Sequence, residues 1–235
     1  MEYLVVIGIC IIFLVILKFA WNIKISDIKK VKNIGYDKEL NEITNKLPEN
    51  KEICKYLLKK LNNEKVQLKE SQDKDNKTSL YIALSNSILI ANINDTFTRV
   101  QTMAHECLHS IQNRRTLLFN FFYSNIYFIY FLCICILSLL RLNEHGMIHL
   151  FILTILGAIY YAIRSYIEMD AMTKAKPLAK EYIEEQKVLT TEEQNKVLDN
   201  YEVINDIAIK MTNYTLIMNC TAKVIIYALI LSIFH

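Results

Sequence analysis

The sequence has little glycine and proline, with four glycines and two prolines among 235 residues. Both residue types interrupt helices, so their scarcity, together with a 53% share of hydrophobic residues, predicts a mainly helical chain. A strong excess of charge of either sign is also absent, because 27 basic and 24 acidic residues leave a formal charge of +3. This charge is too small and too scattered to indicate a nucleic-acid partner.

A disulfide framework is not expected either, although the chain has six cysteines. Cys54 lies in an amphipathic segment, and Cys107 faces away from the histidines described below. The others lie within apolar runs: Cys10, Cys133, Cys135 and Cys220. We therefore expect six reduced thiols, none of them a metal ligand.

Apolar residues are concentrated in four runs, residues 4–21, 117–140, 147–163 and 214–234. Each is long enough to cross a bilayer as a helix, which predicts a multi-pass membrane protein. The first run is expected to be a retained anchor, because Glu2 precedes it and no convincing small-residue cleavage site accompanies it.

The basic residues predict the orientation of these runs. Lysines follow the first run directly, Arg114 and Arg115 precede the second, and residues 164–213 again carry several lysines, whereas residues 141–146 hold a single basic residue. Basic residues accumulate on the cytoplasmic side. Residues 22–116 and 164–213 are therefore predicted to be cytoplasmic, with both termini outside.

The sequence HECLH, residues 105–109, has the pattern of a zinc hydrolase. On a helix His105 and His109 lie on one face and can bind one metal ion, while Glu106 beside them can act as general base towards metal-activated water. A second pair with the same spacing, His145 and His149, has no glutamate after its first histidine, so we expect a structural or incidental role for it.

The third ligand of such a zinc site can come from a distant part of the chain. After the second and third runs the chain returns to the same side of the membrane, and Glu168 is the first carboxylate that it reaches. Glu168 shares a helical face with Ala171 and Ala175, whose small side chains would allow close approach to the HECLH helix. We predict Glu168 as the third ligand, whereas Asp170, about 200° further around the helix, suits a supporting or structural contact.

These segments resemble a known family. TMAHECLHSIQ, followed after two apolar segments by EMDAMTKA, is similar to the YugP-type membrane zinc metallopeptidases, in which the corresponding stretches read approximately AAHExGHAIQ and EFDASxxA. The resemblance covers nearly the whole chain and implies zinc ligands His105, His109 and Glu168, with Glu106 as base. Leu108 replaces the glycine of the family pattern, which we interpret as an altered packing contact.

Local patterns predict the surrounding elements. A helix from about Thr96 to Asn113, capped by Asn94 or Asp95, would carry HECLH, with Phe97, Val100, Ala104, Leu108 and Ile111 as its apolar stripe. Residues 79–84 alternate as a strand, with Leu80, Ile82 and Leu84 on one face, ended by residues 85–87. This strand could hold an extended peptide or merely cover the core. Residues 49–61 form an amphipathic helix, and Thr190 with Glu193 forms a capping box for a helix over about residues 191–211.

The sequence therefore predicts a mainly α polytopic membrane protein with about four transmembrane helices and a small zincin-like α+β catalytic domain in the cytoplasm. The predicted parts are a membrane anchor (4–21), a cytoplasmic region with the zinc helix (22–116), a transmembrane hairpin (117–163), cytoplasmic helices with the third ligand (164–213) and a last transmembrane helix (214–234). The predicted function is zinc-dependent cleavage of polypeptides, themselves membrane-associated, at the cytoplasmic membrane surface. The alternative is a non-catalytic membrane scaffold or degenerate relative with a structural metal site.

Overall fold

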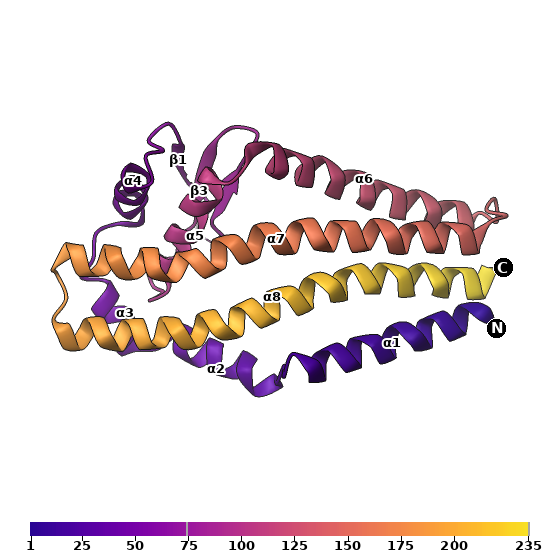
Figure 1. The fold of residues 1–235 in the computed structure, drawn as a ribbon, viewed down its shortest axis with the longest axis horizontal. Coiled ribbons are helices and arrows are strands. Elements are labelled where there is room, and N and C mark those ends of the chain that lie inside the picture. Colours follow the sequence, from indigo (N-terminus) through magenta and orange to yellow (C-terminus); the bar gives the residue numbers. More distant parts are fainter. Residues whose placement is uncertain (74, 235) are drawn as a thin grey trace. The chain divides into compact units, whose positions relative to one another are not determined.

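A computed structural model describes residues 1–73 and 75–234, and in this part of the chain it contains eight α-helices and three short strands (Figure 1). The helices are α1 (Glu2–Ala20), α2 (Ile25–Gly35), α3 (Lys38–Thr44), α4 (Asn50–Lys60), α5 (Arg99–Ile111), α6 (Arg114–Leu139), α7 (Gly146–Gln186) and α8 (Thr191–Phe234). The strands are β1 (Gln67–Glu70), β2 (Leu80–Ile82) and β3 (Ser87–Ile90). The prediction of a mainly helical chain is confirmed.

Four helices are long and apolar enough to cross a membrane: α1, α6, α7 and α8. They contain the four apolar runs found in the sequence, except for the last residue of each of the first two runs. The last two helices extend well beyond those runs, because α7 has 41 residues and α8 has 44. Two of the predicted boundaries, near residues 163 and 213, therefore fall inside continuous helices. Hydropathy changes at these points, but nothing in the local sequence stops a helix there.

The chain divides into two compact units, one formed by residues 1–24, 119–166 and 210–234, the other by residues 25–118 and 167–209. We call them the apolar unit and the mixed unit. In the apolar unit, α6, α7 and α8 share a core that includes Tyr127, Leu153 and Tyr227. The Tyr227 hydroxyl also accepts a buried hydrogen bond of 2.6 Å from the side-chain amide nitrogen of Asn143.

The mixed unit contains a three-stranded sheet in the order β1-β3-β2, in which β1 runs parallel and β2 antiparallel to β3. The sequence pattern predicted β2 but ended it with a break over residues 85–87, whereas Ser87 begins the central strand β3. The run Ser87–Ile90 is nearly all buried, so it lacks the alternation that identified β2. The predicted apolar face of β2 is also largely exposed, at 48% for Leu80 and 50% for Leu84, and Tyr81 packs on the core instead.

Helix α5 lies in the core of the mixed unit. Phe97, Val100 and Ala104 are fully buried and Leu108 nearly so, as predicted, whereas Ile111 is 46% exposed. The predicted caps are wrong, because Thr98 is the N-cap residue and Asn94 instead bonds with the side chains of Asn50 and Glu49.

Arg99, in the first turn of α5, anchors this end of the helix. Its buried guanidinium donates hydrogen bonds of 2.7 to 2.8 Å to the carbonyl oxygens of Thr44, Leu47 and Pro48. These carbonyls lie at and just beyond the end of α3, so one side chain satisfies backbone acceptors that a helix end leaves without partners.

Two other local predictions are confirmed. The amphipathic helix expected over residues 49–61 is α4. The capping box precedes α8, where the Thr190 N–H donates to Glu193 Oε2 at 3.0 Å and the Glu193 N–H donates to Thr190 Oγ1 at 3.3 Å.

Candidate metal centre

Helix α5 brings the two histidines of HECLH together. The Nε2 atoms of His105 and His109 lie 3.0 Å apart, and the two rings meet edge to face with centroids 4.5 Å apart. One helical turn separates the residues, so the rings leave the same face of α5. His109 is buried and His105 partly buried, which places both nitrogens at the edge of the packed core.

Glu168 reaches the same point from α7. Its Oε2 atom lies 3.4 Å from Nε2 of His105 and 3.8 Å from Nε2 of His109. The alanines on this face of α7 allow the approach, because Ala171 and Ala175 are buried in the core that α5 shares. The structure thus brings together three residues that the sequence separates by two apolar runs.

These three side chains could hold a metal ion. The circle through the two Nε2 atoms and Oε2 has a radius of about 2.0 Å, which is the usual length of a bond from such atoms to a divalent transition metal. Among the residues that the structure describes, no fourth histidine, cysteine, aspartate or glutamate joins the group. The residues present therefore fit an ion with three protein ligands.

Gln112, the residue that ends α5, orients His109. Its amide nitrogen lies 2.8 Å from the carbonyl oxygen of Ile167 and 2.9 Å from Oδ2 of Asp170, both of which accept hydrogen bonds. The amide oxygen therefore faces Nδ1 of His109, at 2.8 Å. Since an amide oxygen can only accept, Nδ1 carries the proton and Nε2 presents its lone pair to the metal site.

Asp170 of α7 contacts the site through Gln112, from which it accepts a hydrogen bond. Besides the bond from Gln112, it forms an ion pair with Lys174, and these two hydrogen bonds hold the pKa of Asp170 below its ordinary value. Asp170 does not belong to the group of three ligand residues. Gln112 was not identified as a site residue from the sequence, because its contacts with α7 depend on the tertiary fold.

Glu106 is directed towards the sheet. Its Oε2 atom accepts a 2.6 Å hydrogen bond from the backbone N–H of Tyr81, in the edge strand β2, and the residue is 6% exposed. This contact ties β2 to α5 and fixes the orientation of the carboxylate. Nothing in the local sequence indicated it, because the donor is a backbone group of another element.

The remaining cysteines and histidines lie elsewhere. Cys107 is fully buried against Cys54, and the hydrogen bond between their side chains, with burial, raises the pKa of the Cys107 thiol well above its ordinary value. Cys107 is therefore a neutral core residue. His149 pairs with the hydroxyl of Tyr130 at 2.9 Å, and neither it nor His145 belongs to the metal-binding group.

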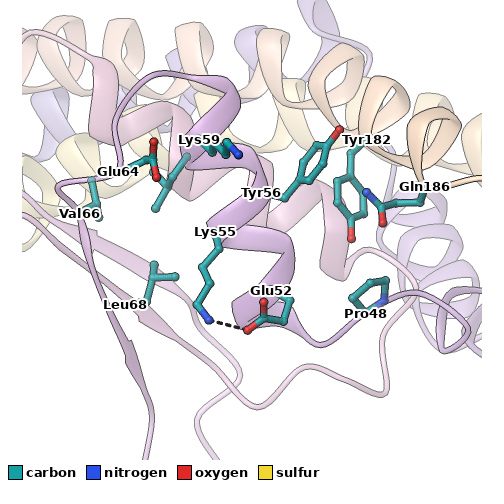
Figure 2. A pocket seen from close by; sticks show the side chains of 11 residues that line it. Pro48, Glu52, Lys55, Tyr56, Lys59, Glu64, Val66, Leu68, Tyr182 and Gln186 are labelled. Atoms are coloured by element: carbon teal, nitrogen blue, oxygen red, sulfur yellow. Dashed lines mark hydrogen bonds and ion pairs between the residues drawn. The ribbon is translucent and has the colours of Figure 1, made fainter.

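A separate groove of about 450 Å³ lies along α4 (Figure 2). Tyr56 of α4 and Tyr182 of α7 meet edge to face at its rim, and Lys55 pairs with Glu52 across one turn of α4. The residues that line it include none of the three metal-binding side chains. The candidate metal centre is thus distinct from this groove.

Comparison of the chain with protein-family models, with curated proteins and with solved structures finds no match. The resemblance to the YugP-type metallopeptidases therefore rests on the sequence segments quoted above. The geometry of the three ligand residues is an independent observation, because it depends on the fold and not on that resemblance.

Proposed function

We propose that this protein is a multi-pass membrane zinc endopeptidase, of the type that the YugP-like segments suggest, with its active site on the cytoplasmic side. The observation that carries the proposal is the convergence of the His105, His109 and Glu168 side chains on one point. Glu106 directly follows the first histidine in α5, and its carboxylate is held by a backbone N–H of β2. Two imidazoles and a carboxylate from a helix pair form a ligand set of zinc peptidases.

The number of ligands supports a catalytic over a structural site. A structural zinc site is closed by four protein ligands, whereas a catalytic site has three and leaves a position for water or substrate. A zinc ion held by these residues would supply Lewis acidity, which makes water nucleophilic near neutral pH and polarises a peptide carbonyl.

The chain's own residues then have separate tasks. Glu106 is not a ligand in this scheme, so its carboxylate can take a proton from the attacking water and pass it to the leaving amine. Tyr81 holds that carboxylate in place through its backbone N–H. Gln112 keeps the Nδ1 proton on His109, which leaves Nε2 as the ligand atom.

The position of the ligands along the chain suggests the class of substrate. His109 lies eight residues before the second apolar run, and Glu168 lies five residues after the third. The basic residues beside the runs favour the cytoplasm for this side. We therefore propose substrates that are membrane-bound or that unfold beside the bilayer.

The test compares the full-length protein with its Glu106→Gln and His109→Ala variants. Metal content is measured by mass spectrometry, and cleavage is measured on an unfolded, fluorescently labelled polypeptide in lipid vesicles. We expect about one zinc per chain and cleavage for the wild type, zinc without cleavage for Glu106→Gln, and loss of both for His109→Ala. If the wild type binds zinc but shows no Glu106-dependent cleavage, the result would instead favour the scaffold with a structural metal.

A further inference from the structure

A lysine lies near the middle of the last apolar helix. Lys223 is the only charged residue of α8 after Lys210. At 1.5 Å per residue it is about 14 Å from Tyr214 and about 16 Å from Phe234, the two ends of the fourth apolar run. If α8 crosses the bilayer as proposed, this lysine lies at its centre, where a charged side chain requires a partner.

The ammonium group of Lys223 contacts an aromatic ring of the helix α6. It lies 5.1 Å from the centre of the Tyr127 ring, and Tyr127 is itself ten residues into the second apolar run. The ring is held in place by burial and by stacking on Tyr160, with centroids 5.7 Å apart. This contact keeps the charge at mid-depth, away from the lipid headgroups that a lysine nearer the helix end would reach.

A second polar side chain accompanies the lysine. Asn219 lies one turn earlier on the same face of α8, and it is exposed. The structure records no hydrogen bond of its side chain within the described part of the chain. The exposed amide and the half-buried lysine thus place two hydrogen-bond-donating side chains on one face of α8.

The chain has no acidic residue to satisfy these donors. None of the four apolar runs contains an aspartate or a glutamate, so neither this chain nor a second copy can provide a carboxylate at this depth. A carboxylate accepts hydrogen bonds from both an ammonium and an amide, and pairs of intramembrane charges are the usual arrangement.

We propose that Lys223 and Asn219 form a docking surface for a transmembrane helix of another protein that carries an aspartate or glutamate near its midpoint. The surface depends on α8 being in the membrane, and it does not depend on peptidase activity.

The test uses the purified full-length protein, labelled with a fluorescent donor, in vesicles of phosphatidylcholine. The probes are acceptor-labelled membrane-spanning peptides of about 20 leucine and alanine residues that differ only in a central Asp, Asn or Leu. Fluorescence energy transfer from the labelled protein to a labelled peptide measures their association. We expect the Asp peptide to associate on the order of tenfold more tightly than the Leu peptide.

Variants of the protein then show which of its side chains binds the aspartate of the peptide. Lys223→Met should reduce binding of the Asp peptide to that of the Leu peptide, Lys223→Arg should retain the preference, and Asn219→Leu should weaken it. Lys18→Met is the matched control, because Lys18 is also half-buried but lies in the last turn of α1. The control should bind the Asp peptide as the wild type does.

Equal binding of the Asp and Leu peptides to the wild type would overturn the proposal, and so would a Lys223→Met protein that keeps the preference. A third outcome would show that the lysine binds an anionic lipid. In that case phosphatidylglycerol would stabilise the wild type but not Lys223→Met, and the wild type would show no preference among the peptides, which would reject the helix partner. The peptide series on the wild type decides the question even if a variant fails to fold.

Discussion

Gln112→Leu tests how the metal site is held together. Leucine fills a similar volume but removes the acceptor for Nδ1 of His109 and the two donations to Ile167 and Asp170. The metal-binding side chains remain, but His109 loses the contact that fixes its proton and its ring orientation. Such outer contacts typically contribute 10- to 100-fold to metal affinity, or about 1.4 to 2.7 kcal/mol.

Zinc affinity should be measured by competition with a chromophoric chelator, using metal-free protein in detergent. The matched control is Gln101→Leu. Gln101 is a buried glutamine within α5, whereas Gln112 is half-buried at its C-cap. The Gln101 amide donates to Asn205 at 2.9 Å and has no recorded contact with the histidines. Gln112→Leu loses partly buried hydrogen bonds and Gln101→Leu loses one buried hydrogen bond, each worth about 1 kcal/mol in folding, whereas only Gln112→Leu should lose zinc affinity.

Two outcomes would refute this reasoning. If Gln112→Leu binds zinc as tightly as the wild type, the amide does not orient His109 in solution. If Gln101→Leu loses zinc affinity to the same degree, the effect comes from a general destabilisation of α5. Gln112→Glu provides a further check, because its carboxylate can still accept from His109 but cannot donate to Ile167.

Three other predictions use separate measurements. Glu168→Ala should lower zinc occupancy as severely as His109→Ala, whereas Asp170→Ala should have a milder effect on metal content; a neutral Glu168→Ala would show that another group is the third ligand. Cys107→Ser should keep near-normal cleavage, since the thiol is buried in the core, and an inactive, folded variant would contradict this. A single cysteine at Asn113, in a background without native cysteines, should react with an impermeant thiol reagent only when the cytoplasmic face is exposed; labelling of intact cells would reverse the orientation.

The parts of the structure that depend on periodicity could be predicted from the sequence. The four apolar runs, the amphipathic α4 and the capping box before α8 each have a local signal, and each is present. The His105 and His109 pair is also local, because one helical turn sets its geometry. Glu168 could be selected because the predicted topology returns the chain to the same side of the membrane, and alanines on its helical face permit a close approach.

The remaining features depend on tertiary contacts that leave no local pattern. Asn94 has the chemistry of an N-cap, but its side chain bonds to Asn50 and Glu49, so α5 begins later than predicted. The alternation in β2 showed which residues share a face but not which face the core covers. The contacts of Glu106 with Tyr81 and of Gln112 with Asp170 each join elements far apart in sequence, so only the fold could reveal them.

The discontinuity of the mixed unit has a consequence for biosynthesis. Its first stretch, residues 25–118, leaves the ribosome with both histidines but without Glu168, which follows only after residues 119–166 have been made. The core also needs the second stretch, since Tyr201 donates a buried hydrogen bond to the carbonyl of Phe97. At about 5 to 20 residues per second, the nascent chain spends several seconds with two of its three ligands. Assembly of the candidate metal centre is therefore a late event, completed only after the chain between the two stretches has been synthesised, and a fragment that stops before Glu168 lacks one of its three side chains.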